Sequence, residues 1–160
     1  FDLSFFVNSY DFVLLVETFT KSLPENFFPS HKSFISPGVK ISDNIHGRLS
    51  GGVVLLVRNE LVKYVELIDI ETDNMIAIKL SHRLLGTQTD CLLLGVYLPP
   101  ENSPYYAETD IYNGVSMLED CLFELGRVHG DLPLIIFGDL NSRTGSANAR
   151  TCDRSSRWNV

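Results

Sequence analysis

The segment that most constrains the fold of this chain is LPLIIFGDLNSRTG, residues 132–145. It begins with a short apolar run, Pro133 to Phe137, which predicts a fully buried strand, although a helix fragment of this length has the same pattern. The run ends at Gly138 and is followed at once by a carboxylate, Asp139, and an amide, Asn141. These two side chains are two residues apart, so they face the same side of an extended segment and can meet one phosphate or water together. Open α/β sheets build their active-site crevices in this way, at the carboxyl ends of buried strands.

A tight turn is the alternative interpretation of Gly138 to Asn141, because Gly, Asp and Asn are the commonest turn residues. A second segment shifts the balance towards a catalytic site. Phe12 to Val16 is also an apolar run, predicts a buried strand, and ends in a carboxylate, Glu17. One glutamate in that place is typical of a solvated strand end, but two acids after two similar strands favour a shared site.

Composition limits the chain to an ordinary globular class. Its 160 residues are 44% hydrophobic and 21% charged, which suits one domain with a sizeable core. The formal net charge of −7 argues against a globally basic nucleic-acid binder, but not against an enzyme whose metal ion supplies a local positive field. Cys91, Cys121 and Cys152 lack metal-ligand spacing, so we expect free thiols in a reducing compartment. Neither a membrane-spanning run nor a signal peptide is apparent, so we expect an intracellular protein with no membrane partner.

The middle of the chain predicts further strands. Ser50-Gly51-Gly52 supplies a turn or bulge before a third apolar strand, Val53 to Val57. Lys63 to Ile70 and Asn74 to Leu80 alternate in part between apolar and polar residues, with Asp73-Asn74 as a turn between them. We therefore expect these two segments to form successive antiparallel strands.

A strand–helix–strand unit is expected between Cys91 and Phe137. The fourth apolar strand, in CLLLGVYLPP, carries Tyr97 and ends at Pro99-Pro100, because proline cannot donate to a strand ladder. A helix is predicted over residues 110–126, with Thr109 or Asp110 as its N-cap and Gly126 at its end. The unit is a βαβ crossover or its antiparallel equivalent. The apolar positions at helical spacing are Ile111, Val115, Leu118, Leu122 and Leu125.

The sequence changes character after Ser142, where apolar periodicity is lost and arginines become frequent. Arg143 is a candidate nucleic-acid contact, because a local basic patch can touch phosphates. We expect a partial catalytic domain over residues 1–145 and a polar, basic, disordered tail over residues 146–160.

An ordered set of motifs resembles the endonuclease/exonuclease/phosphatase superfamily, and is most similar to the endonuclease domains of non-LTR retrotransposons. The motifs are VET at Val16–Thr18, SGGV at Ser50–Val53, GVYLPP at Gly95–Pro100 and IFGDLN at Ile136–Asn141. The superfamily includes exonuclease-III-type abasic endonucleases, pancreatic-type DNases and inositol polyphosphate phosphatases. The resemblance covers Tyr10 to Gly145. It implies an α/β fold of the DNase-I-like class, a four-layer sandwich of two mixed β-sheets flanked by helices, present here in incomplete form.

The resemblance implies roles for four residues. Glu17 matches the metal-binding glutamate, and Tyr97 matches the tyrosine that lies against the scissile phosphate. Asp139 matches the aspartate that orients or deprotonates the attacking water, and we expect it to lie near the metal as well. Asn141 matches the neighbouring residue that positions the phosphate.

The chain departs from the family pattern in several places. Val16 stands where the family usually has Gln, and Leu140 where Phe is common, and both changes keep an uncharged side chain. The family's first strand, which ends in an asparagine, and its last Ser-Asp-His segment have no match, and the first residue is not Met. We therefore expect a domain truncated at both ends. The histidines, none of them in a Ser-Asp-His context, are His31, His46, His82 and His129.

The expected chemistry is phosphodiester hydrolysis that depends on Mg²⁺ or Mn²⁺, since carboxylate oxygens suit these hard cations. Three classes of function remain open. The first is a DNA endonuclease of a retroelement, acting in the nucleus and continuous with a reverse transcriptase in the parent protein. The second is a phosphoesterase of the same superfamily that acts on inositol phosphates or phospholipid head groups. The third is an inactive remnant that keeps only the fold.

Overall fold

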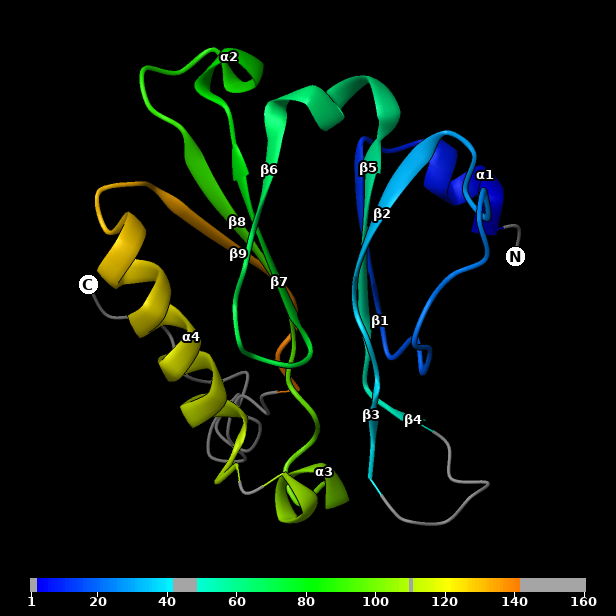
Figure 1. Cartoon of the computed structure of the whole chain (residues 1–160), viewed down its shortest axis with the longest axis vertical. Coiled ribbons are helices and arrows are strands. Elements are labelled where there is room, and N and C mark those ends of the chain that lie inside the picture. The colour runs from blue at the N-terminus through cyan, green and yellow to red at the C-terminus, as the bar shows by residue number, and fades with distance from the viewer. Residues whose placement is uncertain (1–2, 42–48, 110, 142–160) are drawn as a thin grey trace, which may run out of the picture.

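The first of the two larger β-sheets is built around a central strand that is almost entirely buried (Figure 1). In this computed structural model β5 (Val53–Arg58) lies between β1 (Phe12–Val16) and β2 (His31–Ser36), and both pairings are antiparallel. Val53 to Val57 are all buried, as their apolar run predicted, because both faces of β5 are covered. β1 is confirmed as a strand but is mostly half-buried, since it lies at the edge of this sheet. The structure describes residues 3–41, 49–109 and 111–141.

The second sheet is mixed and contains the predicted crossover. β6 (Val65–Ile68), β7 (Met75–Leu80) and β8 (Cys91–Tyr97) are successive antiparallel neighbours, which confirms the two strands predicted from alternation. β9 (Leu134–Asp139) pairs with β8 in parallel. The chain passes from β8 to β9 through the helix α4 (Gly114–His129), so the unit is a βαβ crossover rather than its antiparallel equivalent.

Helices cover the outer faces of both sheets, which gives the predicted four-layer α/β sandwich (Figure 1). α1 (Leu3–Asn8) lies outside the first sheet, where Val7 packs against residues of β1 and β5. α4 lies outside the second sheet, and between the two sheets β5 packs against β7 and β8. The remaining elements are β3 (Val39–Lys40) paired with β4 (Leu49–Ser50), a 3₁₀ turn η1 (Asn59–Tyr64), α2 (His82–Leu85) and α3 (Pro104–Glu108). No helix among the described residues combines the length and apolarity needed to cross a bilayer.

α4 begins and ends later than predicted. Its N-cap is Asn113, which forms a capping box: its Oδ1 accepts from Ser116 N at 2.9 Å, and Ser116 Oγ accepts from Asn113 N at 3.3 Å. Thr109 instead closes α3, because its hydroxyl donates to the Tyr105 carbonyl at 2.7 Å. Gly126 lies inside the helix, and Gly130 is the C-cap.

The exposure of β9 differs most from the sequence prediction. The apolar run predicted full burial, but Leu134, Ile135 and Ile136 are 38%, 51% and 39% exposed. The reason is that, within the described part of the chain, β9 pairs only with β8 and forms the edge of its sheet. A run of apolar residues gives a strand its tendency to be buried, while the neighbouring segments decide whether both faces are covered.

Some expectations concern residues outside the described ranges. These are the tail at residues 146–160, the candidate nucleic-acid contact Arg143, and Cys152. Cys91 and Cys121 are buried free thiols, as expected, and burial raises the pKa of both.

The fold makes a specific prediction at Gly138, in β9 directly before Asp139. Gly138 has φ +141°, and a Cβ built there would lie 1.9 Å from the Val96 carbonyl oxygen. We expect Gly138→Ala to lower the free energy of unfolding by about 3 kcal/mol or more, because backbone strain adds to a clash with backbone. Urea denaturation measures this value.

Two glycines serve as matched controls for that substitution. Gly86 has φ +66°, and a Cβ added to it would meet no atom within 4 Å, so Gly86→Ala should cost only about 1 kcal/mol. Gly126 lies in α4 with open space around it, so Gly126→Ala should raise stability by about 0.5–1 kcal/mol. Equal effects of Gly138→Ala and Gly86→Ala would contradict the close approach of β9 to β8.

Candidate active site

Three strands from the two sheets end near one another, and each delivers a polar side chain predicted from the sequence. Glu17 follows β1, Tyr97 is the last residue of β8, and Asp139 is the last residue of β9. β1 contacts both β8 and β9 across the space between the sheets. Tyr97 and Asp139 are direct partners in the parallel register of β8 and β9. The fold therefore brings together residues that lie far apart in the sequence.

A short hydrogen bond joins the two sheets at this point. The Tyr97 hydroxyl donates to Glu17 Oε1 at 2.6 Å, a length typical of a hydrogen bond to an ionised acceptor. Tyr97 is only 3% exposed, whereas Glu17 faces solvent. Because a carboxylate can accept several hydrogen bonds or metal contacts, Glu17 keeps free capacity towards solvent while Tyr97 holds its orientation.

The environment of Tyr97 keeps its hydroxyl protonated. Burial is the largest cause of a raised Tyr97 pKa, followed by the hydrogen bond and negative charge of Glu17, with a smaller contribution from the charge of Asp139. A phenol whose pKa lies above its ordinary value remains a hydrogen-bond donor across the neutral pH range and does not act as a base there. The influence of Asp139 also places both carboxylates within electrostatic reach of the same phenol.

Asp139 and Asn141 form a local turn that is also part of the site. Asp139 Oδ1 accepts from Asn141 N at 2.9 Å, and Asn141 Nδ2 donates to the Leu98 carbonyl at 2.8 Å. The Asp139 carbonyl accepts from Leu98 N at 2.9 Å. The turn and catalytic interpretations of this segment are thus compatible. An amide nitrogen carries two hydrogens, so Asn141 can also donate to a phosphate oxygen.

The backbone around Glu17 is strained and is supported by a neighbouring turn. Glu17 and Phe19 have φ +53° and +51°, values that non-glycine residues adopt at a cost. Thr18 N donates to the Gly52 carbonyl at 3.1 Å, and Phe19 N donates to the Gly51 carbonyl at 2.9 Å. The positive φ of both glycines confirms the turn predicted there.

The residues present fit a hydrated divalent cation. Glu17 and Asp139 offer carboxylate oxygens, and Mg²⁺ commonly needs only one or two carboxylates while it keeps several waters. In residues 3–41, 49–109 and 111–141, no three His, Cys, Asp or Glu side chains gather closely enough to form a metal site on their own. A cation here would therefore depend on Glu17 and Asp139 together with water or substrate oxygens.

The described histidines lie away from this site and make other contacts. His31 in β2 is buried, with Nε2 2.9 Å from the Tyr10 carbonyl oxygen. His82 at the start of α2 pairs with Asp90 at 2.8 Å. His129 ends α4.

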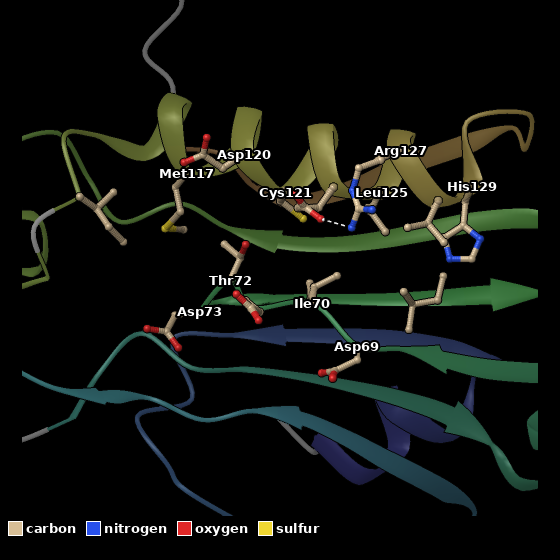
Figure 2. A pocket seen from close by; sticks show the side chains of 15 residues that line it. Asp69, Ile70, Thr72, Asp73, Met117, Asp120, Cys121, Leu125, Arg127 and His129 are labelled. Atoms are coloured by element: carbon tan, nitrogen blue, oxygen red, sulfur yellow. Dashed lines mark hydrogen bonds and ion pairs between the residues drawn. The ribbon is translucent and has the colours of Figure 1, made fainter.

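An acidic hollow of about 590 Å³ lies between α4 and residues 68–73, and Figure 2 shows that acidic side chains project into it from both sides. Its single arginine, Arg127, already pairs with Glu124 at 3.0 Å. The hollow includes none of the predicted site residues, and its acidity disfavours phosphate.

A larger hollow of about 930 Å³ borders the site. Leu98, Leu140 and Asn141 line one part of it, while Tyr112 and Val115 near the start of α4 line another. Tyr112 is 89% exposed. This hollow adjoins the segment that carries Asp139, so a substrate bound there has room beyond its phosphate.

Sequence reasoning missed one buried polar residue behind the site. Asn74 is 0% exposed, and its Oδ1 accepts from Gly52 N at 2.7 Å. In the sequence it belonged to a predicted turn, and its φ of +59° confirms that turn. Asparagine is so common in turns that the sequence carried no signal of a contact with Gly52.

The fold resembles that of a solved structure, the human Nocturnin catalytic domain with bound sulfate anion. The TM-score is 0.55 at 16% sequence identity, and the match covers 94% of this chain but 58% of the Nocturnin chain. The chain thus spans well under two thirds of that domain. Comparison with curated protein sequences found no match.

The sequence itself matches the family described as "Endonuclease/Exonuclease/phosphatase family" over residues 6–159. This match covers nearly the whole chain and includes every candidate site residue. The chain therefore belongs to the endonuclease/exonuclease/phosphatase family, a family of hydrolases that act on phosphate esters.

Proposed function

We propose that this chain is part of a metal-dependent DNA endonuclease, the nicking domain of a non-LTR retroelement. The observation that supports it most is the meeting of Glu17, Tyr97 and Asp139 at the ends of three strands. Family membership supports phosphodiester hydrolysis in general. The choice of DNA rests on the ordered motifs at Val16, Ser50, Gly95 and Ile136, which are most similar to retroelement endonucleases.

Each residue has a distinct task in the proposed reaction. Glu17 holds the cation, which when bound neutralises charge on the phosphoryl oxygens. Asp139 accepts a proton from the attacking water, since Asn141 N occupies only one of its oxygens. Asn141 Nδ2 donates its second hydrogen to the phosphate, and the protonated Tyr97 keeps Glu17 in place.

Two further observations are consistent with a phosphodiester substrate. The Nocturnin catalytic domain is described with a bound sulfate, a tetrahedral anion like a phosphate group. In this chain the hollow of about 930 Å³ beside Asn141 can hold the groups that flank the scissile phosphate. In the proposed setting the parent protein carries a reverse transcriptase and acts in the nucleus.

A small phosphoester is the second candidate substrate, and one observation favours it. The formal net charge of −7 repels a long polyanion but matters less for a small molecule that reaches only the cation. Inositol phosphates and phospholipid head groups belong to this class.

The first prediction about activity concerns Asp139. Supercoiled plasmid incubated with Mg²⁺ should be nicked, EDTA should abolish nicking, and Asp139→Ala should slow it by about 100-fold or more, because a general base contributes about 10²–10⁴-fold. Asp131→Ala, at an exposed aspartate in the loop before β9, is the control and should leave the rate unchanged. Gel quantitation of open-circular DNA measures the rate.

The same assay separates the three classes of function. Nicking by Asp139→Ala at the parent rate would exclude the assigned base. Release of phosphate from inositol polyphosphates without nicking would favour the small-molecule enzyme. If a protein shown to be folded hydrolyses neither substrate, the chain is an inactive remnant that keeps only the fold.

The second prediction concerns the metal dependence of the rate. Glu17→Gln removes the charge that holds the cation, and Tyr97→Phe removes only the hydrogen bond that orients Glu17. We expect both to raise the Mg²⁺ concentration at half-maximal rate, Tyr97→Phe by about 10-fold, in the range found when an outer partner of a metal ligand is lost. Tyr10→Phe, at an exposed tyrosine before β1, is the matched control. An unchanged Mg²⁺ requirement in Glu17→Gln would refute Glu17 as the ligand.

A further inference from the structure

We propose that Asn74 is a positioning residue of this site, which holds the turn that carries Glu17 and the strand that carries Tyr97 at a defined separation. The inference rests on the proposed roles of Glu17 and Tyr97. It assigns to Asn74 no contact with substrate or cation.

The side chain of Asn74 is fully buried against the turn at Gly51 and Gly52. Its Oδ1 accepts from Gly52 N at 2.7 Å, in a region closed to solvent. A Cβ built on Gly51 would lie 2.1 Å from the same oxygen, so only glycine permits this approach. The side-chain amide of Asn74 thus accepts a hydrogen bond from Gly52 and packs closely against Gly51.

The turn at Gly51 and Gly52 also forms hydrogen bonds with the backbone that follows Glu17. Thr18 N and Phe19 N donate to the carbonyls of Gly52 and Gly51 at 3.1 and 2.9 Å. Glu17 and Phe19 both have positive φ, and a strained conformation persists only where its surroundings determine it. A loose glycine turn would therefore release the backbone on either side of Thr18.

The backbone carbonyl of Asn74 forms a hydrogen bond with Tyr97, the partner of Glu17. This carbonyl accepts from Tyr97 N at 2.9 Å, at the end of β8. Glu17 follows a strand of the first sheet, and Tyr97 ends a strand of the second. Asn74 is consequently bonded to the turn that precedes β5 of the first sheet and to the last residue of β8 in the second, and Tyr97 in turn donates to Glu17 at 2.6 Å.

A hydrogen bond is needed here because apolar packing is not directional. The side chains between the sheets, such as Val53 and Ile76, keep the sheets in contact through packing that has no preferred direction. A buried hydrogen bond restricts both distance and angle. Asn74 thereby limits the movement of Glu17 relative to Tyr97.

Asn74→Gly tests the proposal with the least disturbance to the backbone. Glycine accepts the φ of +59° at this position but lacks the acceptor for Gly52 N. Asn26→Gly is the matched control, because Asn26 has φ +58° and is exposed in a loop.

The first measurement does not depend on activity. Amide hydrogen exchange, followed by NMR, should become at least about 10-fold faster at Thr18, Phe19 and Gly52 in Asn74→Gly, with Leu55 in β5 as an unaffected reference. Asn26→Gly should show the parent rates. Unchanged exchange at Thr18 and Phe19 in Asn74→Gly would overturn the inference. If Asn74→Gly does not fold, Asn74→Ser replaces it, since the serine oxygen falls short of Gly52 N.

The second measurement asks whether the displacement reaches the site. Asn74→Gly should raise the Mg²⁺ concentration at half-maximal rate about 10-fold, whereas Asn26→Gly should keep the parent requirement. Combined with Tyr97→Phe, Asn74→Gly should add little, because Tyr97→Phe has already released Glu17. Full additivity, or an unchanged Mg²⁺ requirement despite faster exchange, would contradict a positioning role.

The two proposals fail in different ways. A parent protein with no Mg²⁺-dependent hydrolysis of any phosphodiester would remove the proposed function. The exchange rates at Thr18, Phe19 and Gly52 would then decide alone whether Asn74 holds the Glu17 turn.

Discussion

The hydrogen bond from the Tyr97 hydroxyl to Glu17 is the interaction on which the candidate site depends. It joins a buried phenol of one sheet to an exposed carboxylate of the other at 2.6 Å. Most of the contact between the sheets is apolar and non-directional, so it stabilises the sandwich without determining the distance between two particular side chains. The hydrogen bond between Tyr97 and Glu17 fixes this distance at one point, at the edge where the strands end.

The topology explains why the polar residues gather at that edge. β8 and β9 run parallel, so their carboxyl ends coincide and Tyr97 lies beside Asp139. The parallel pairing in turn requires the α4 crossover, because no tight hairpin can join parallel strands. β1 belongs to the other sheet but contacts both strands, and its direction brings Glu17 to the same edge. One helix on an outer face thus indirectly places Asp139.

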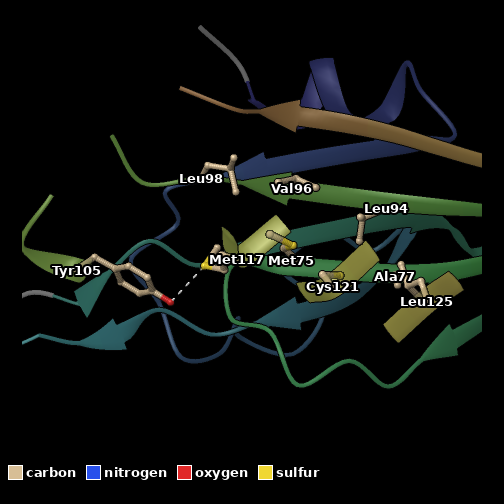
Figure 3. Packing of buried hydrophobic residues seen from close by; sticks show 9 residues of the cluster. All are labelled: Met75, Ala77, Leu94, Val96, Leu98, Tyr105, Met117, Cys121 and Leu125. Atoms are coloured by element: carbon tan, nitrogen blue, oxygen red, sulfur yellow. Dashed lines mark hydrogen bonds between the residues drawn. The ribbon is translucent and has the colours of Figure 1, made fainter. Parts of the chain in front are cut away.

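Part of this arrangement was predictable from the sequence, and the physical reasons for the limits are specific. Local apolar runs predicted β5 and β8, and partial alternation predicted β7, because these patterns are contained in the residues of each strand. The spacing predicted a helix here, but its packed face is centred on Met117, Cys121 and Leu125 (Figure 3). Of the positions predicted for that face only Leu125 is buried, and Val115 is 62% exposed. The start of α4 was also missed, because Asn113 competes with two other good caps in the same segment. The exposure of β9 was missed, since it depends on which segments lie beside it.

The site residues show the same division between local and long-range information. Glu17, Tyr97, Asp139 and Asn141 were predicted through ordered motifs, and the structure brings them to one edge, while their chemical roles remain proposals. Asn74 was not predicted, because its contact with Gly52 joins residues 22 positions apart and leaves no local pattern. Turn residues that also form long-range hydrogen bonds look like any other turn in a single sequence.

The electrostatics of the site connect its geometry to the need for a cation. The ionisable groups that act on Tyr97 are Glu17, Asp139 and Tyr106, and each of them raises the Tyr97 pKa. Two carboxylates near the same neutral phenol repel each other and also repel a phosphodiester, so the local field opposes the binding of such an anion. In the proposed function, a divalent cation would reverse the sign of that field, and the same carboxylates would serve as its ligands. The formal net charge of −7 makes this reversal more important, since the rest of the chain does not supply it. In the proposed function, binding of substrate and binding of metal would therefore be coupled at this edge, where the hydrogen bond from Tyr97 orients Glu17.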